Sequence, residues 1–339
     1  MFFHKSTNVR IHTWHLRPLM TRAGFVAAER VAPSAGAAVA ARLWFTVPTT
    51  TAYTRRSRAT LPTGTAFTAD VDSRTVRGTS WGTGDLVYLV HGWGGWGNQL
   101  EAMVPPLLEA GLKVVTFDAL SHGDSDSGRD GPRSTAVPEM VESLRAVVSR
   151  QGPARAIVAH SLGAMTTAAA LRDGLAADRV VFVALAGSFE PTADAFGARL
   201  GFGPRVRARL MARVERRVRR RYGETLVRFD VPAIADVLAA QGRDPDLLVV
   251  HDHADPETPF TAAVAISEAW PRSTLVATTG LGHRRILRDP RVVAQVCDFV
   301  AGGRSPAAAE APGLLRPVAR PVVPCTGVRR SATAEPRGA

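Results

Sequence analysis

Short apolar runs alternate with longer amphipathic stretches along most of the chain. The runs are rich in Val, Ile and Leu, and they occupy residues 85–91, 113–118, 155–160, 179–185, 246–251 and 273–278. Near-continuous apolar runs of this length are typical of parallel strands that are buried on both faces of a sheet. We therefore predict six parallel strands.

The stretches between these runs predict helices over residues 98–111, 134–150, 162–174, 259–270 and 290–301. Strands that alternate with helices indicate a doubly wound α/β fold with helices on both faces of the sheet. Residues 61–81 instead alternate apolar and polar side chains between glycines, as two antiparallel strands would. The predicted fold is an α/β protein with a mostly parallel, eight-stranded sheet.

One interval breaks this alternation. About sixty residues separate the runs at 179–185 and 246–251, which is far more than one crossover helix requires. We predict that residues 189–243 form a helical cap, inserted after the sixth strand and covering the strand ends. Residues 61–188 and 244–301 would then form the core.

The two ends of the chain differ from the core in composition. Residues 1–60 are predicted to be a partly helical extension, in which the apolar stretch 23–45 is interrupted by Glu29, Arg30 and Arg42. That stretch favours a short helix lying on the domain over a membrane span. Residues 302–339 are rich in Pro, Ala and Arg without periodicity, which predicts a disordered tail. Residues 1–19 lack the pattern of a signal peptide, and Met20 is a candidate start.

Composition indicates the cellular environment that the protein is expected to occupy. The chain of 339 residues has two cysteines, Cys297 and Cys325, so no disulfide framework is expected. A reducing, cytoplasmic location is the default expectation for such a chain. No apolar stretch is long enough to predict stable membrane insertion. The sequence carries no indication of oligomeric state.

The formal net charge is +12, and many arginines lie between Arg205 and Arg221. The apolar residues of this segment are spaced by four, which indicates one face of an amphipathic helix with solvated arginines around it. Because no aromatic residues are interleaved, we do not expect nucleic-acid binding. Attraction of anionic substrates or membrane surfaces is a weaker alternative.

The strongest chemical signal is the segment Ala159-His160-Ser161-Leu162-Gly163, where a strand ends at His160 and a helix begins at Leu162. A serine on such a sharp turn matches the pattern of a nucleophile elbow, G-x-S-x-G, with Ala in place of the first Gly. The turn requires small residues on both sides of the serine. The alternative is that Ser161 caps the helix.

An acid and a base follow in the expected order. Asp255 comes after the strand at 246–251, and His283 lies in a Gly-rich loop after the strand at 273–278. All three residues therefore lie at the carboxyl ends of strands, where a doubly wound fold places its active site. Spacing alone leaves Asp252 and Glu190 open as the acid.

Five separate stretches together resemble the α/β-hydrolase family over residues 65–301. They are VHGWGGWGNQ, FDALSHGDSD, AHSLGA, HDHADPETP and GLGHRRIL. The resemblance implies that Ser161 is the nucleophile, Asp255 the acid and His283 the base. It favours Asp255 because HDHADPETP aligns with the family's G-x-x-D-x-x-x-P. The interval 189–243 matches the family's cap.

Gly92, Gly94 and Gly97 form a G-x-G-x-x-G pattern that is also typical of dinucleotide binding, with Asp118 further on. Two bulky tryptophans crowd this loop, and two strands already precede it, so we favour a different role. The resemblance implies that the N–H groups of Trp93 and Leu162 form an oxyanion hole.

These observations predict a serine hydrolase that forms an acyl-enzyme, acts on carboxylic esters of small molecules, and requires no cofactor or metal. Thioesterase, amidase, C–C hydrolase and cofactor-free haloperoxidase activities are alternatives on the same fold, and a non-catalytic binding protein is another. The segment HDHAD resembles a metal motif but lacks its other ligands. Candidates for contact with substrate are His91, Gly92, Trp93 and His160, although scaffold hydrogen bonds suit the histidines better.

Overall fold

A single eight-stranded sheet forms the centre of the molecule. The computed structural model describes residues 16–48 and 61–302. The strands are β1 (Thr65–Val71), β2 (Arg74–Trp81), β3 (Leu86–Val90), β4 (Lys113–Asp118), β5 (Ala154–His160), β6 (Ala177–Val183), β7 (Asp246–Asp252) and β8 (Ser273–Thr278). Their order across the sheet is β1-β2-β4-β3-β5-β6-β7-β8.

The direction of the strands confirms the predicted fold class. β1 pairs antiparallel with β2, and β2 pairs antiparallel with β4. All other neighbours pair in parallel. The carboxyl ends of β3 to β8 therefore meet at one edge of the sheet, and the loops that leave these ends can bring distant residues together.

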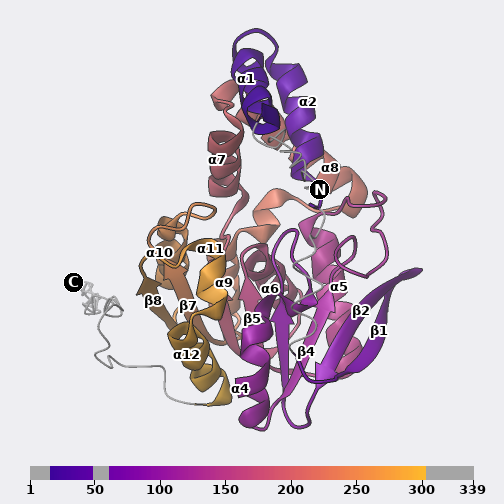
Figure 1. Cartoon of the computed structure of the whole chain (residues 1–339), viewed down its shortest axis with the longest axis vertical. Coiled ribbons are helices and arrows are strands. Elements are labelled where there is room, and N and C mark those ends of the chain that lie inside the picture. Colours follow the sequence, from indigo (N-terminus) through magenta and orange to yellow (C-terminus); the bar gives the residue numbers. More distant parts are fainter. Residues whose placement is uncertain (1–15, 49–60, 303–339) are drawn as a thin grey trace, which may run out of the picture.

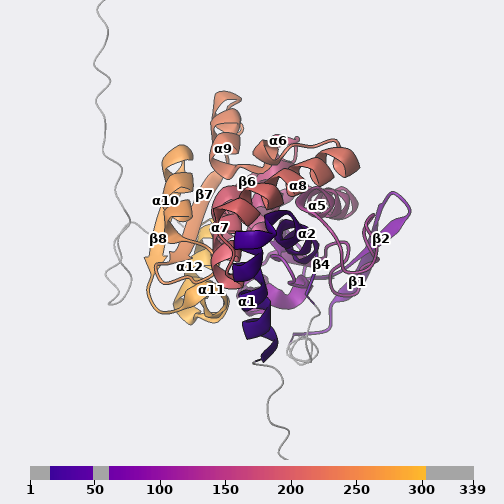
Figure 2. The ribbon, with the colours of Figure 1, turned by 90° about the horizontal axis from the view of Figure 1, so that it is seen from above.

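Helices cover both faces of the sheet (Figures 1 and 2). On one face, α12 (Pro290–Ala301) packs against η1 (Gly97–Met103) and α4 (Val104–Glu109). On the other, α6 (Leu162–Arg172) packs against α5 (Val137–Gln151) and α9 (Val231–Ala240), and α9 packs against α10 (Phe260–Ala269). Two short helical turns, α11 (Gly282–Arg285) and η3 (Ile286–Arg288), follow β8.

Local sequence signals explain where α12 begins and ends. The Asp289 side chain accepts hydrogen bonds from the N–H groups of Arg291 and Val292, and Pro290 occupies the first turn. Gly302 ends the helix in a left-handed conformation with a φ of 106°. An N-terminal carboxylate followed by proline, with a C-terminal glycine, satisfies the backbone groups that a helix leaves unpaired at its two ends.

Four further helices form a lobe beyond the sheet: α1 (Leu16–Val31), α2 (Pro33–Trp44), α7 (Phe189–Leu200) and α8 (Pro204–Tyr222) (Figure 1). Helix α8 buries Val206, Leu210, Val214 and Val218, each at most 2% exposed. Helix α2 packs against this stripe, and a Cβ at Gly36 would lie only 3.1 Å from Val206. Small residues on α2 therefore allow the two helices to approach closely.

This lobe differs from the sequence-based expectation in two ways. Residues 16–44 form two helices instead of one, and they share the lobe with part of the interval 189–243. Within that interval, η2 (Leu226–Phe229) and α9 pack against α6, beside the sheet. Helical periodicity reveals an apolar face but not the element that will cover it, so the partner of α8 was not predictable.

The structure does not describe every residue of the chain. Residues 1–15, 49–60 and 303–339 lie outside the described residues. The predicted disordered tail after residue 302, with Cys325, lies in the last of these ranges. Within residues 16–48 and 61–302, no helix combines the length and apolar character needed to cross a membrane.

Candidate active site

Ser161 lies on the turn between β5 and α6, in an uncommon backbone conformation with φ 53° and ψ −122°. A positive φ at a residue other than glycine is strained and persists only where the surroundings hold it. A Cβ at Gly163 would lie 2.8 Å from the carbonyl oxygens of His91 and Val90, and a Cβ at Gly92 would lie 2.8 Å from the Cβ of Ser161. Close packing against small residues therefore fixes the turn.

The loops after β7 and β8 bring two predicted side chains to this serine. His283 Nε2 lies 3.0 Å from Ser161 Oγ, and His283 Nδ1 lies 2.8 Å from Asp255 Oδ2. Ser161 and His283 are 122 positions apart in the chain, yet the three residues form one continuous line of hydrogen bonds. The sequence-based grouping of Ser161, Asp255 and His283 matches this arrangement.

The Asp255 side chain is completely buried and saturated with donors. Its Oδ1 accepts the N–H groups of Glu257 (2.8 Å) and Thr258 (3.0 Å), and its Oδ2 accepts the Thr258 hydroxyl (3.0 Å). Burial opposes ionisation, but the hydrogen bond and charge of His283, with these amides, lower the pKa of Asp255 to about 2. An ionised Asp255 accepts a hydrogen bond from the N–H at His283 Nδ1, which leaves Nε2 as the unprotonated atom facing Ser161.

The two alternative acids have other partners. Asp252 accepts hydrogen bonds from the Thr278 hydroxyl (2.8 Å) and the Leu281 N–H (2.9 Å), so it connects the end of β7 to the loop that carries His283. Glu190 lies on α7 and forms an ion pair with Arg207 at 2.5 Å. Among the three candidate carboxylates, Asp255 is the one that reaches His283.

The family to which this arrangement belongs is shown by comparison with known proteins. A model of the alpha/beta hydrolase family matches residues 87–296, more than half of the chain. The chain belongs to the alpha/beta hydrolase family. It is therefore an enzyme of the hydrolase class. A search of curated proteins finds no match for this hydrolase.

Several solved structures share the fold. A candidate lipase from Acinetobacter baumannii has a TM-score of 0.55 at 15% identity, covering 75% of this chain and 97% of its own. An esterase from Exiguobacterium antarcticum has a TM-score of 0.51 at 18% identity, covering 70% and 99%. A bromoperoxidase from Bacillus anthracis has a TM-score of 0.52 at 15% identity, covering 70% and 99%. At such low identities the likeness concerns the fold alone.

Two buried histidines of the hydrolase hold the loops beside Ser161. His91 Nε2 accepts the Ala119 N–H at 3.0 Å, and its Nδ1 contacts the Gly92 carbonyl at 2.8 Å. His122 Nε2 accepts the Gly94 N–H at 3.1 Å. A ring nitrogen that accepts from an amide carries no proton, so both rings are neutral. Burial lowers the pKa of both histidines, that of His122 to about 3.

His160 contacts His283 through a hydrogen bond to its backbone and through their rings. Its Nε2 lies 3.0 Å from the His283 carbonyl, and the two rings are 4.7 Å apart. Burial, with the nearby charge of His283, lowers the pKa of His160 to about 3. His160 therefore acts as a neutral scaffold residue that positions the loop of His283.

Two backbone amides near Ser161 remain candidates for an oxyanion hole. The Gly92 and Gly94 amides donate to Gln99 and His122, and the Trp93 amide lies between them. Leu162 is the first residue of α6, so its N–H is one of the donors that lack an acceptor within the helix.

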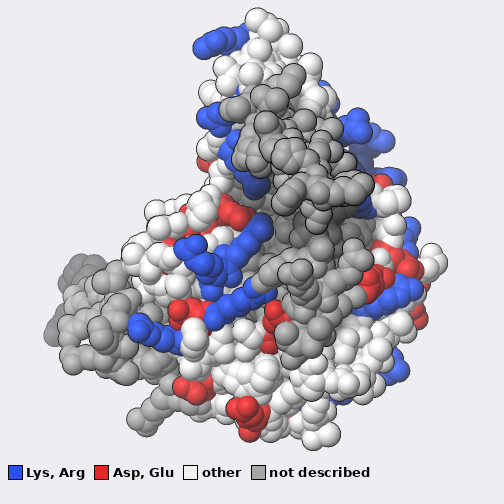
Figure 3. Space-filling model, in the orientation of Figure 1, with Lys and Arg blue, Asp and Glu red and all other residues white. Residues whose placement is uncertain are grey.

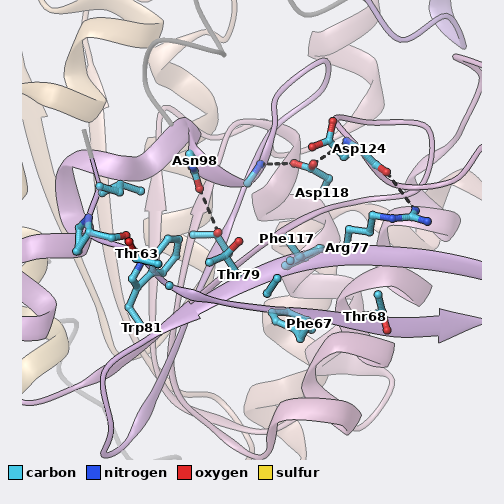
Figure 4. A pocket seen from close by; sticks show the side chains of 17 residues that line it. Thr63, Phe67, Thr68, Arg77, Thr79, Trp81, Asn98, Phe117, Asp118 and Asp124 are labelled. Atoms are coloured by element: carbon cyan, nitrogen blue, oxygen red, sulfur yellow. Dashed lines mark hydrogen bonds between the residues drawn. The ribbon is translucent and has the colours of Figure 1, made fainter. Parts of the chain in front are cut away.

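Asp118 does not serve the dinucleotide-binding alternative. Its carboxylate accepts the N–H groups of Gly97 (2.6 Å) and Asp124 (2.8 Å), so it fixes two loops (Figure 4). It borders a surface cavity of about 640 Å³ whose lining comes mainly from β1, β2, β4 and the start of η1. None of Ser161, Asp255 and His283 lines this cavity. This cavity therefore lies apart from the hydrogen-bonded group of Ser161, Asp255 and His283.

A smaller cavity of about 190 Å³ opens over Ser161. Of the four predicted substrate-contact residues, only Trp93 lines it, because His91, Gly92 and His160 lie behind the turn. Most of its wall is apolar and comes from the helical lobe and the segment before α5: Leu43, Trp44, Phe45, Ala136, Val137, Phe189, Phe196, Val214 and Val218. The Trp44 ring meets the Phe196 ring edge-on at 5.3 Å.

Sequence reasoning missed most residues of this cavity, including Glu257 and Trp44. Glu257 lines it, with Oε2 3.8 Å from His283 Nε2 and Oε1 3.4 Å from Arg284 Nε. Its place two residues after Asp255 was the available signal. Trp44 had no such signal, because its position depends on how α2 packs on α8.

The metal alternative finds no ligand set in residues 16–48 and 61–302, where no group of three His, Cys, Asp or Glu side chains is placed to hold a metal ion. The two histidines of HDHAD have separate neighbours. His251 Nε2 lies 3.1 Å from the Thr258 carbonyl, and the His253 ring lies 3.9 Å from that of Phe260.

Proposed function

We propose that this hydrolase cleaves carboxylic esters with a short, apolar acyl group through a Ser-His-Asp mechanism. The observation that carries the proposal is the line of hydrogen bonds from Asp255 through His283 to Ser161, at 2.8 and 3.0 Å. A nucleophile, a base and a residue that orients the base, in this geometry, are what acyl transfer requires.

In the proposed reaction, Ser161 Oγ attacks the ester carbonyl carbon as His283 Nε2 takes its proton. The alcohol then leaves with that proton, and the acyl group stays on Ser161. Water gives a proton to His283 and attacks the acyl carbon, which releases the carboxylic acid and restores the serine. Asp255 remains ionised and stabilises the charged imidazole in both steps.

The negative oxygen of the tetrahedral intermediate would accept hydrogen bonds from the N–H groups of Trp93 and Leu162. Each donor of such a hole contributes roughly 2.7–4 kcal/mol to transition-state stabilisation in mutational tests. The turn at Ser161 supports this assignment, because Leu162 directly follows Ser161 and is the first residue of α6.

The cavity over Ser161 supports the proposed size and polarity of the acyl group. Its volume of about 190 Å³ is below the roughly 300–1,000 Å³ of pockets that take drug-sized ligands. Glu257 is the acidic residue in its wall, beside His283. A negative charge at this place disfavours acyl groups that carry a carboxylate and favours neutral ones.

The test combines covalent labelling with substrate turnover. A fluorophosphonate probe should label Ser161 in the wild type, as located by mass spectrometry, and should not label Ser161→Ala. A panel of esters, thioesters and amides with increasing acyl length should show turnover of short-chain esters that Ser161→Ala lacks. Absence of labelling in folded protein would overturn the mechanism, while labelling with preferred thioester or amide turnover would reassign the substrate class.

A further inference from the structure

The large apolar side chains exposed to solvent are concentrated on α1 and α2. Six such side chains occur in the described residues, and four of them are Val26, Val31, Val39 and Leu43. Val31, at the turn between the two helices, is 83% exposed. Isolated exposed apolar residues are ordinary, but a concentration of them on one element marks an interaction surface.

Helix α2 also lacks the charged residues that normally cover a solvent-exposed helix. Between Val31 and Leu43, Arg42 is the single ionisable side chain. Helix α8, which packs beside it, carries nine arginines and one glutamate in 19 residues. The turn between α1 and α2 lies at the end of the molecule farthest from the sheet (Figure 1). Arg205 donates to the carbonyls of Glu29 and Arg30 there, while Val31 stays exposed.

Positive charge lies along the other half of α2. Arg42 and five arginines of α8 line a surface groove beside Ala38 and Phe45, with Asp130 as its acidic residue: Arg213, Arg216, Arg217, Arg220 and Arg221. Near the turn, the ionised Glu29 accepts the amides of Gly203, Arg205 and Val206. Arg205 also donates to the Arg30 carbonyl, so two arginines stand beside this one carboxylate. In Figure 3 the end of the lobe is white, with blue side chains along its flanks.

We propose that the α1–α2 hairpin docks on the surface of an anionic lipid bilayer. An apolar face enters the boundary between headgroups and acyl chains, while nearby arginines attract anionic headgroups. A second copy of the chain fits this surface less well, since it would place arginines against arginines, and like charges in contact are costly. The contact is peripheral, and no helix spans the bilayer.

The same helix leads from the proposed membrane surface to the active site. Leu43 is 40% exposed and also lines the cavity over Ser161, together with Trp44 and Phe45. A short-chain ester that partitions into the bilayer surface would therefore lie close to the entrance of this cavity. This second step rests on the proposed esterase function, whereas the docking itself does not.

The experiment measures sedimentation of the full chain with vesicles of phosphatidylcholine, with and without phosphatidylglycerol. Wild type and Ser161→Ala should bind the anionic vesicles equally. The double variant Val31→Glu/Val39→Glu should bind at least about tenfold more weakly, because two apolar side chains leave the interface and two negative charges enter it. Its turnover of a water-soluble ester should be unchanged.

The matched control is Val227→Glu/Val237→Glu, which adds the same charge at valines that are 70% and 41% exposed on η2 and α9. This control should bind vesicles like the wild type. Equal weakening in both double variants, no binding to anionic vesicles by wild type, or a solution dimer that Val31→Glu/Val39→Glu dissociates would each overturn the docking proposal. Loss of ester turnover with vesicle binding intact would instead count against the esterase proposal alone.

Discussion

The carboxyl edge of the sheet and the helical lobe of this hydrolase differ in how their side chains are packed. At the carboxyl edge of the sheet, the side chains of Asp255 and His283 are buried and hydrogen-bonded in a line that ends at Ser161. In the helical lobe, small residues and arginines form helices that expose valines to solvent. The sheet edge holds Ser161 in a strained backbone conformation, whereas the lobe presents exposed apolar side chains to the solvent. A substitution should therefore change chemistry at one end and selectivity at the other.

The largest expected effect is a loss of activity on substitution of the buried Asp255. Asp255→Asn should lower kcat by about 10⁴-fold, because a neutral amide no longer holds the proton on His283 Nδ1 and no longer stabilises the charged ring. Steady-state kinetics on a short-chain ester, with a melting curve to verify folding, measures this effect.

Asp252→Asn is the control, since Asp252 is equally buried at the end of the same strand. It should lower stability through its bonds to Thr278 and Leu281 and leave at least a tenth of the activity. Comparable activity losses in the two variants would remove the distinction between the acid and its neighbour.

The buried histidines should make the sheet edge sensitive to acid. The pKa values of His122 and His160 are about 3 in the folded protein and about 6.5 when unfolded. The unfolded state therefore binds protons first, so this contribution to stability is complete above pH 6.5 and is lost as the pH falls toward 3. Between pH 7.5 and 5.5 the free energy of unfolding should fall by roughly 3 kcal/mol for the pair.

Urea denaturation at the two pH values tests this expectation. The variant His122→Asn, which keeps a polar side chain on the same loop, should reduce the pH effect by the share of one histidine, about 1.4 kcal/mol. An unchanged pH dependence in that variant would show that other groups cause it.

Glycine substitutions compare the two regions directly. Gly163→Ala should destabilise the protein by roughly 1–3 kcal/mol and reduce activity, because its Cβ would meet two carbonyl oxygens at 2.8 Å. Gly24→Ala on α1, where a Cβ meets nothing within 4 Å, should be neutral or stabilise the helix by up to about 1 kcal/mol. Thermal melting and ester turnover measure both; equal destabilisation by the two variants would contradict the contrast.

The same contrast explains what the sequence could predict. Ser161, Asp255 and His283 were predictable because each follows an apolar strand, and parallel strands bring such positions to one edge of the sheet. Local chemistry and topology were sufficient there. Asp252 could not be separated from Asp255 by spacing, because only the course of the loop after β7 decides which carboxylate reaches His283.

The lobe was less predictable for a physical reason. Residues 16–44 and α8 lie far apart in the chain, and each shows an apolar face without indicating its partner. Packing of Gly36 against Val206 decides the pairing, and it places Trp44 over Ser161. Glu257 was missed because a glutamate in an exposed-looking loop carries no sign of whether it turns toward the cavity.

The smallest expected effect concerns Trp44, where the lobe meets the site. Trp44→Ala should enlarge the cavity and raise the preference for longer over shorter acyl esters by roughly tenfold in kcat/KM, since an apolar pocket discriminates by about 1–3 kcal/mol per methylene group. Trp81→Ala is the matched control, because this tryptophan is buried and lines the other cavity, away from Ser161. It should lower stability without changing the preference. If Trp44→Ala left the preference unchanged while Ser161 kept its reactivity, the wall formed by α2 would have no part in selecting the acyl group, and the lobe would serve only to cover the sheet edge.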